Sequence, residues 1–303
     1  MKLPESLTLT PIYSAPSSWW QHVPIAHWIV EKLKPNKVVE LGTHYGVSFF
    51  SFCEAAEKHS PNTFVYAIDT WEGDTHAGHY EDEVYDIVKK HSSKYHFQRS
   101  ELIRSRFEEA ATYFADNTID ILHIDGLHTY EAVDEDYRTW LPKLVYGGSI
   151  IFHDWNVRER GFGVWRLWEE IKEDQNFSCL ETPNGHGLAI ATLSEQRPSW
   201  HDQLEEILPI LVTKGGLLSE INRSRERLDQ LQKDHEEANN HSFNLEKLLI
   251  EKAHHVDSLI KNSKELQAQI DVLQAQTDEL RNSSILKKLK RRVIWFLKKI
   301  SYR

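Results

Sequence analysis

Two clusters of polar residues each follow a short apolar run, in the sequences Ile124-Asp-Gly-Leu-His-Thr-Tyr130 and Phe152-His-Asp-Trp-Asn156. Two carboxylates with an amide or a water form a ligand set for a hard divalent cation such as Mg²⁺. A cation held there would bind a substrate hydroxyl and lower its pKa, so that the oxygen becomes a nucleophile. The predicted metal-site residues are Asp125, Asp154, His153 and Asn156.

His128 stands three residues after Asp125, and an unperturbed imidazole pKa of about 6.5 suits a proton acceptor. We predict that His128 and Asp125 are the catalytic residues. Two alternatives stay open: Asp125 as the cap of the following turn, and His153 as a residue that orients Asp154 without binding metal. His123 alternates with the apolar residues of its run and is expected to be structural.

A glycine-containing turn comes earlier, in Val38-Val-Glu-Leu-Gly-Thr-His-Tyr-Gly46. Gly42 allows a tight turn close to a ligand, and Gly46 allows close packing of strand and helix. The next apolar run ends in Asp69, where an acid can accept hydrogen bonds from both ribose hydroxyls of an adenosine ligand. The predicted cofactor residues here are Glu40, Gly42, Thr43, His44, Gly46, Asp69 and Thr70.

The order Glu-x-Gly-x-x-x-Gly, followed by an acid at the end of the next strand, resembles the class I S-adenosylmethionine (SAM)-dependent methyltransferases. A dinucleotide-binding turn would instead need a glycine where His44 stands. The later segments Ile-Asp-Gly-x-His-x-Tyr and Gly-Gly-x-Ile-x-x-His-Asp resemble metal-dependent O-methyltransferases, in particular a bacterial family found in surface-polysaccharide and natural-product clusters. The resemblance covers residues 19–193.

This resemblance implies SAM as the cofactor and O-methyl transfer to a sugar hydroxyl. Catechol-type members of the group hold magnesium with an Asp after the fourth strand and an Asp-Asn pair after the fifth. Asp125 and Asp154 match these aspartates, and His128 falls where that type has its catalytic lysine. Trp155 stands where the Asn is expected, so Asn156 or His153 would supply the third ligand. Family position also places Ser100 at the adenine and Asp125 beside the cofactor.

Short apolar runs alternate with helical patterns through the first 200 residues, which predicts a Rossmann-like, doubly wound, mostly parallel seven-stranded sheet of the α/β class. Ligands of such sheets bind beyond the carboxyl ends of the strands, where the polar clusters fall. The predicted strands are 37–41, 64–69, 95–99, 119–125 and 148–154, with a closing hairpin of 177–181 and 187–192. The predicted helices are 46–58, 80–91, 102–114, 130–141 and 163–174.

Proline and glycine give the domain boundaries, because all ten prolines lie at or before Pro209 and all thirteen glycines at or before Gly216. We predict a methyltransferase domain over 1–200, a linker over 201–216, a coiled coil over 217–282 and a basic amphipathic helix over 283–303. A heptad pattern with leucine at most d positions runs from Leu217, which predicts a homo-oligomer, either a dimer or a trimer.

The last segment, 284–303, holds eight basic residues and no acidic one. Its apolar residues share one helical face, a pattern typical of helices that lie on an anionic membrane surface. A partner-binding helix and an end cap of the coiled coil are the alternatives.

Composition narrows the function further. The chain of 303 residues carries a net charge of −10, and the part before residue 284 carries −18, so no nucleic-acid partner is expected. Two cysteines exclude a disulfide scaffold, and neither a signal peptide nor a membrane-spanning run is visible. We therefore expect a cytoplasmic enzyme that its tail brings to the inner face of the plasma membrane.

Two rival functions remain open from the sequence: a non-catalytic coiled-coil scaffold of a glycan-biosynthesis complex, and a metal-dependent hydroxylase of related fold.

Two aromatic segments, 18–24 and 69–80, flank the predicted site. Their tryptophans could stack on sugar faces or could pack a lid, and His76 and His79 could make polar contacts. Gly73 and Gly78 are candidate hinges of a loop that closes over the cofactor.

Overall fold

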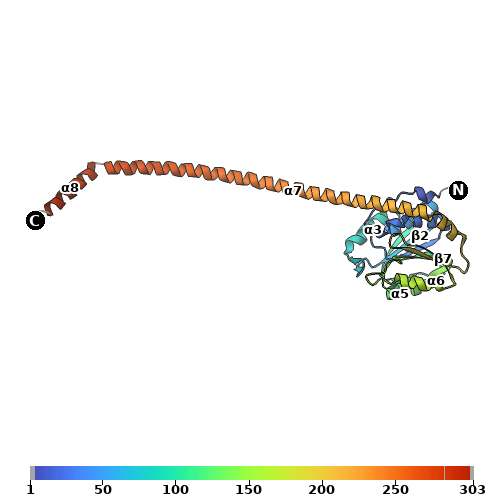
Figure 1. Ribbon diagram of the computed structural model, residues 1–303. Coiled ribbons are helices and arrows are strands. Elements are labelled where there is room, and N and C mark those ends of the chain that lie inside the picture. Colours follow the sequence, from blue (N-terminus) through green and yellow to red (C-terminus); the bar gives the residue numbers. More distant parts are fainter. Residues whose placement is uncertain (1–3, 283, 301–303) are drawn as a thin grey trace. The chain divides into compact units, whose positions relative to one another are not determined.

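A seven-stranded sheet forms the centre of the first of two units in the computed structural model, which describes residues 4–282 and 284–300 (Figure 1). The units are Met1–Leu228 and Asp229–Arg303. The strand order is β5-β2-β1-β6-β7-β9-β8, in which the first five strands are parallel and β9 is antiparallel to both neighbours. The predicted fold is confirmed. The strands are β1 (Lys37–Leu41), β2 (Phe64–Asp69), β5 (Ser100–Arg104), β6 (Ile119–Ile124), β7 (Leu144–His153), β8 (Phe177–Thr182) and β9 (Leu188–Leu193).

Helices cover both faces of this sheet, and each face has its own apolar core. One core joins the sheet to α1, α2, α3 and the first turns of α7, and the other joins it to α4, α5 and α6. The helices are α1 (Val23–Leu33), α2 (Val47–His59), α3 (Asp82–Tyr95), α4 (Phe107–Ala110), α5 (Tyr130–Trp140), α6 (Val164–Glu173), α7 (Ser199–Asn282) and α8 (Ser284–Ile300). Short 3₁₀ turns lie at Glu5–Thr8, Ser18–Gln21, Ala111–Tyr113 and Leu141–Lys143, and a small hairpin pairs β3 (Gly73–Asp74) with β4 (Gly78–His79).

The region of the third parallel strand differs from the sequence prediction. Residues 95–99 end α3 and form the following turn, and the strand is 100–104 instead. The predicted helix over 102–114 is reduced to α4 and one 3₁₀ turn. The register with β2, which pairs Val65 with Ser100 and Asp69 with Arg104, selects this segment as the strand. Because it is a half-exposed edge strand, its apolar pattern is weak and resembles that of a helix.

The segment predicted as a linker, 201–216, is helical and belongs to α7. Leu204, Ile207 and Leu211 recur at helical spacing and are buried in the core that α1 and α2 share. Burial of this stripe outweighs the helix-breaking tendency of Pro209. Gly215 fits because a Cβ there would lie 2.0 Å from the carbonyl oxygen of Gln21. The globular unit therefore extends to Leu228.

The second unit contains α8 and the part of α7 that follows Leu228. Every side chain described between residues 229 and 279 is exposed, including the leucines of the heptad pattern. At about 1.5 Å per residue, the 229–282 part of the helix is roughly 80 Å long. In the described part of the chain, no helix combines the length and the apolar character that crossing a bilayer requires.

Candidate active site

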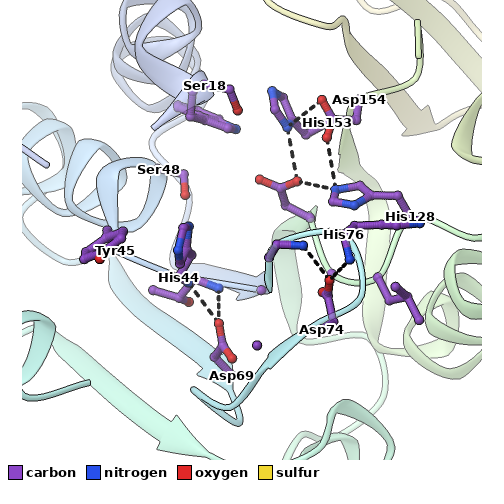
Figure 2. Close-up of a pocket in the computed structure, with 18 of the residues that line it drawn as sticks. Ser18, His44, Tyr45, Ser48, Asp69, Asp74, His76, His128, His153 and Asp154 are labelled. Carbon is purple, nitrogen blue, oxygen red and sulfur yellow. Dashed lines mark hydrogen bonds and ion pairs between the residues drawn. The ribbon is translucent and has the colours of Figure 1, made fainter. Parts of the chain in front are cut away.

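One pocket of about 650 Å³ lies at the carboxyl ends of the central strands (Figure 2). The strand order reverses between β1 and β6, and ligands of doubly wound sheets bind at such a switch point. The pocket is lined by side chains from seven parts of the chain: 16–19, 42–48, the loop 69–80, 106–108, 125–128, the segment 153–162, and residue 186. The two predicted clusters, for cofactor and for metal, thus face one cavity.

The turn after β1 needs glycine at two positions. Gly42 has a φ of +86°, and a Cβ there would lie 2.1 Å from the carbonyl oxygen of Asp125. Gly46 has a φ of +82°, and a Cβ would press on Phe50 at 2.9 Å. His44 between them also takes a left-handed conformation, with a φ of 50°. The turn therefore lets its backbone approach both the neighbouring strand and the pocket.

Asp69 holds this turn in place. Its Oδ2 accepts hydrogen bonds from the backbone N–H groups of Thr43 (2.8 Å) and His44 (2.9 Å), and its Oδ1 accepts one from Trp71 (2.7 Å). A carboxylate accepts about four hydrogen bonds, so little capacity is left for the ribose hydroxyls that the sequence analysis assigned to it. Asp69 lines the pocket, and its contacts hold the backbone of the glycine turn in position.

Thr43 is the polar side chain of this turn that lacks a partner. It is 3% exposed, and its hydroxyl oxygen has no hydrogen-bond partner among the described residues. Buried polar atoms are normally paired, so this hydroxyl fits a ligand in the pocket. Thr70 and Ser48 also line the pocket.

Glu40 is fully buried in the sheet and does not line the pocket. Its Oε2 is 2.9 Å from Nδ1 of His123, the residue paired with it on β6. Nε2 of the same histidine accepts a hydrogen bond of 3.2 Å from the Trp19 indole. These contacts agree with the structural role expected of His123, while Oε1 of Glu40 is buried without a hydrogen-bond partner in the described part of the chain.

Ser100 is not at the site. It begins β5 and so lies at the end of the sheet opposite the pocket. Its hydroxyl donates to the His96 carbonyl at 2.8 Å and lies 3.1 Å from that of Ser92. The predicted strand 95–99 lies five residues before the observed strand, so the prediction for Ser100 was wrong. The residues that follow the true end of β5 reach the pocket instead, namely Arg106, Phe107 and Glu108.

Asp125, His128 and Asp154 form the polar cluster at the other end of the pocket (Figure 2). Nε2 of His128 lies 3.2 Å from Oδ1 of Asp125 and 3.1 Å from Oδ2 of Asp154. One ligand atom from each of the three residues lies within 4.8 Å of the other two, close enough to hold one ion. Oδ1 of Asp154 is buried without a hydrogen-bond partner. Two carboxylates and an imidazole therefore fit a divalent cation.

His153 contacts both carboxylates of this cluster. Its Nδ1 is 3.1 Å from Oδ1 of Asp125 and 3.4 Å from Oδ1 of Asp154. Burial lowers the pKa of His153, but the two carboxylates outweigh burial and raise the pKa to about 9. Burial raises the pKa of Asp125, yet His153 and His128 outweigh it, so the pKa of this carboxyl falls well below its usual range. This geometry matches the orienting role that the sequence analysis left open for His153.

Asn156, the other candidate third ligand, points elsewhere. Its amide donates to the Pro183 carbonyl at 3.4 Å, and it does not line the pocket. His186 from the β8–β9 turn does line the pocket, and its Nδ1 lies 3.3 Å from Oδ1 of Asp154. The sequence analysis did not select His186. Two backbone hydrogen bonds bring this turn to the site, from the Asp154 N–H to the Gly187 carbonyl and from the Asn156 N–H to the His186 carbonyl.

The loop after β2 forms a lid on the pocket. Trp19, Trp20 and Trp71 are all buried in the core that contains α1 and α2, so none of them presents an exposed ring for sugar stacking. Oδ1 of Asp74 accepts the backbone N–H groups of His76 (2.6 Å) and Ala77 (2.7 Å) and so shapes the loop. His79 stays at the surface, outside the pocket lining.

Phe162 joins the lid to the polar cluster, and the sequence analysis also missed it. Its ring stacks on His76 at 4.5 Å and 16°, and on His128 at 4.6 Å and 8°. The two stacks fix the plane of the His128 ring next to the carboxylates. No signal in the sequence distinguishes this phenylalanine from one of the core.

The strand order, the glycine turn after β1 and the pocket at the switch point are the features of a Rossmann-like α/β domain that binds a ligand beyond the carboxyl ends of its strands. Residues 39–155 match the family described as "Methyltransferase domain". A protein of Sinorhizobium fredii described as "Uncharacterized protein y4gI" is 44% identical over 174 residues. That match covers 57% of this chain but only 19% of the relative, so the chain spans about a fifth of that protein.

Several solved structures are similar in fold at low sequence identity. A putative caffeoyl-CoA O-methyltransferase from Staphylococcus aureus is 16% identical, with a TM-score of 0.47 over 63% of this chain and 88% of that one. The O-methyltransferase TomG from Streptomyces achromogenes, solved with SAM, is 13% identical, with a TM-score of 0.45 over 64% and 91%. An O-methyltransferase from Bacillus cereus, solved with SAH, is 15% identical, with a TM-score of 0.44 over 61% and 84%.

Proposed function

We propose that the globular unit is a SAM-dependent O-methyltransferase that acts on a sugar hydroxyl of a cell-surface glycan or a related metabolite. One observation carries the proposal: the turn between Gly42 and Gly46 and the cluster of Asp125, His128 and Asp154 line the same pocket of about 650 Å³. This turn fits the cofactor because Gly42 lets the backbone turn tightly beside the pocket, and because the Thr43 hydroxyl is buried without a hydrogen-bond partner. The choice of a sugar rests on the resemblance of the two motifs and on the tail.

SAM, when bound, supplies an electrophilic methyl group whose bond to sulfur breaks as a bond to the acceptor oxygen forms, leaving the electron pair on sulfur. The residues around the pocket have three tasks in this reaction. The turn between Gly42 and Gly46 positions the cofactor, Asp69 fixes that turn, and the lid with His76 and Phe162 excludes water from the reacting atoms.

We propose that Asp125 and Asp154 hold Mg²⁺ or another divalent cation and that His128 takes the proton of the acceptor hydroxyl. A bound cation lowers the pKa of a coordinated hydroxyl and so favours its ionised form. Nε2 of His128 lies 3.1–3.2 Å from both carboxylates, which places it beside any hydroxyl bound between them. The same position would also allow His128 to be a third metal ligand.

Two His128 variants separate these roles. We expect His128→Ala to keep SAH and Mn²⁺ affinity within a few-fold and to lose turnover by about 10²–10⁴, as is typical when a general base is removed. His128→Gln, which can ligate but cannot take the proton, should be equally slow. A loss of Mn²⁺ affinity in His128→Ala, measured by calorimetry, would instead make His128 a ligand.

The function itself is tested by SAH calorimetry followed by turnover with methyl-labelled SAM, Mg²⁺ or Mn²⁺, and a panel of hexoses, hexose phosphates and uronates. We expect micromolar SAH binding and label on an acceptor oxygen. Failure to bind SAH would favour the scaffold function. Turnover that needs Fe²⁺ and oxygen and transfers no label would favour the hydroxylase, which the histidine in the ligand set also suits.

We also propose that the second unit assembles as a coiled coil. Leu231, Leu245, Leu259, Leu266 and Leu273 repeat on the heptad d positions, and each is 47–63% exposed in the single chain. A lone helix with such a stripe would leave a long apolar surface in water. Sedimentation of the full chain should show a dimer or trimer, and a Leu259→Asp, Leu266→Asp variant should be monomeric. A monomeric wild-type chain at micromolar concentration would overturn this proposal.

The tail is proposed to bind an anionic membrane surface such as the inner face of the plasma membrane. α8 alternates basic residues with the exposed apolar side chains of Leu289, Val293 and Leu297. Removal of 284–303 should abolish sedimentation with phosphatidylserine vesicles. Neutral phosphatidylcholine vesicles are the control, because attraction to anionic lipid adds about 1 kcal/mol per basic residue. Unchanged sedimentation of the truncated chain would exclude the tail as the membrane contact.

A further inference from the structure

A basic side chain at the acceptor side of the pocket has no role in the reaction described above. Arg160 lies in the loop between β7 and α6 and lines the pocket. No described acidic group lies within the 4.0 Å that defines an ion pair for Arg160. Some arginines of the globular unit do have such partners, for example Arg104 with Asp82 and Arg138 with Asp134, whereas Arg158 in the same loop as Arg160 also has none among the described residues. The positive charge of Arg160 is therefore available to a ligand.

The backbone holds Arg160 in an uncommon conformation. Its φ is 55°, in the left-handed region that residues other than glycine rarely adopt, and Gly161 follows with a φ of 78°. Such a conformation is strained and persists where the surroundings enforce it, often at ligand sites. Here it aims the guanidinium over the ring of Phe162, 5.0 Å from the ring centroid.

This contact brings Arg160 close to the reacting groups. The ring of Phe162 also lies parallel to that of His128 at 4.6 Å, so the guanidinium and the proposed base contact the same aromatic ring. Arg158, two residues earlier in the same loop, differs in this respect. Its guanidinium lies over Trp165 at 4.5 Å, and it does not line the pocket. The loop thus directs one arginine to the pocket and the other away from it.

We propose that Arg160 binds an anionic group of the methyl acceptor, a phosphate or a carboxylate next to the methylated hydroxyl. This inference rests on the proposed function and narrows its substrate class from sugars in general to charged sugars. A guanidinium presents two parallel N–H donors to the oxygens of either anion, so it both attracts and orients the acceptor. The cofactor has a carboxylate too, but its cradle is formed by the turn after β1, while Arg160 follows β7.

The experiment measures affinity rather than turnover. Wild-type protein saturated with SAH is titrated by calorimetry with glucose 1-phosphate, glucuronate and uncharged glucose. We expect at least one charged probe to bind tenfold or more tightly than glucose, and the better of the two names the anion. Arg160→Gln should lose this tenfold preference and keep the SAH affinity within twofold. Arg158→Gln is the matched control and should keep both.

Three results would overturn the inference: equal binding of charged and uncharged probes to the wild type, an unchanged preference in Arg160→Gln, or a loss of SAH affinity in that variant. The last result would assign Arg160 to the cofactor carboxylate. The probe titrations are repeated without SAH. A wild type that fails to bind SAH, and so contradicts the proposed function, therefore still yields a result for the anion site.

Discussion

The two ends of the pocket are built from different kinds of hydrogen bond. At the cofactor end, three backbone N–H groups satisfy the carboxylate of Asp69. At the acceptor end, Asp125 and Asp154 contact only imidazole nitrogens among the contacts that the structure gives their side chains. Backbone donors are fixed by the fold, whereas side-chain partners can exchange for a ligand. The hydrogen bonds at the cofactor end are thus fixed by the fold before a ligand binds. Those at the acceptor end can be exchanged for contacts with a ligand.

Buried atoms without partners show the same difference. Among the described residues around the acceptor end, Nδ1 of His76, Nδ1 of His128 and Nε2 of His153 are buried and lack a hydrogen bond. Oδ1 of Asp154 is also buried without a hydrogen bond, and its contacts are the imidazole nitrogens of His153 and His186 at 3.3–3.4 Å. At the cofactor turn the corresponding atom is the Thr43 hydroxyl. Leaving such a group unpaired costs about 1–3 kcal/mol, so native proteins rarely keep several in one place without a ligand or water. The comparison therefore predicts separable effects for variants at the two ends.

The largest effect is expected at the acceptor end. Asp154→Asn preserves shape but removes the negative charge that holds the proposed cation, so turnover should fall by about 10³ or more. SAH affinity, measured by calorimetry, should stay within a few-fold because the cofactor turn is untouched. Asp134→Asn, at the surface pair with Arg138, is the control and should leave both values unchanged. Turnover within tenfold of wild type would remove Asp154 from the reaction.

The next effect concerns the backbone of the cofactor end. In Gly42→Ala, a Cβ 2.1 Å from the Asp125 carbonyl oxygen would push β1 and β6 apart, at a cost of about 2–4 kcal/mol in stability. SAH affinity should fall at least tenfold in the fraction that folds. Gly147→Ala isolates the conformational cost, because Gly147 has a φ of +83° and no neighbour within 4 Å of a Cβ. Equal loss of unfolding free energy in both variants would refute the steric argument.

A smaller effect is expected from Asp69→Asn. Oδ2 of Asp69 accepts two N–H groups and Oδ1 a third, so an asparagine must give up at least one of these bonds. We expect about 1–2 kcal/mol lower stability and roughly tenfold weaker SAH binding, because the turn loosens. Asp74→Asn is the matched control. Both of its backbone bonds use a single oxygen, which an amide retains. Similar SAH affinities for the two variants would count against the positioning role of Asp69.

The sequence was sufficient for the fold wherever strands are fully buried. β1, β6 and the second half of β7 are mostly buried and rich in apolar residues, and they placed Gly42, Asp125 and Asp154 at one edge. The prediction was wrong at the edge strand β5, because its partial exposure hides the alternation of apolar and polar residues. The predicted position of Ser100 was wrong for the same reason. The prediction failed again for His186 and Phe162, which tertiary contacts bring to the site from a hairpin turn and a loop. Such contacts leave no local pattern in the chain.

The smallest effect is a pH dependence at the cofactor end. Burial lowers the pKa of His44, against the opposing influence of Asp69 and Asp125. The folded protein then keeps this ring neutral at a pH where the unfolded chain, with a pKa of about 6.5, takes up a proton. Stability is therefore lost as the pH falls below about 6.5. At pH 5.5 the loss is at most about 1.4 kcal/mol, and less because the ring is partly exposed.

His44→Asn tests this dependence, since asparagine tolerates the left-handed backbone that His44 adopts and does not titrate in this range. Urea unfolding is measured at pH 7.5 and pH 5.5 for both proteins. The wild type should lose up to about 1 kcal/mol more than the variant between the two pH values. A larger loss in the variant would mean that the protonated ring is the stabilising form. The stability of the cofactor end would then depend on a titratable side chain, and the two ends of the pocket would differ less in the kind of contact that holds them.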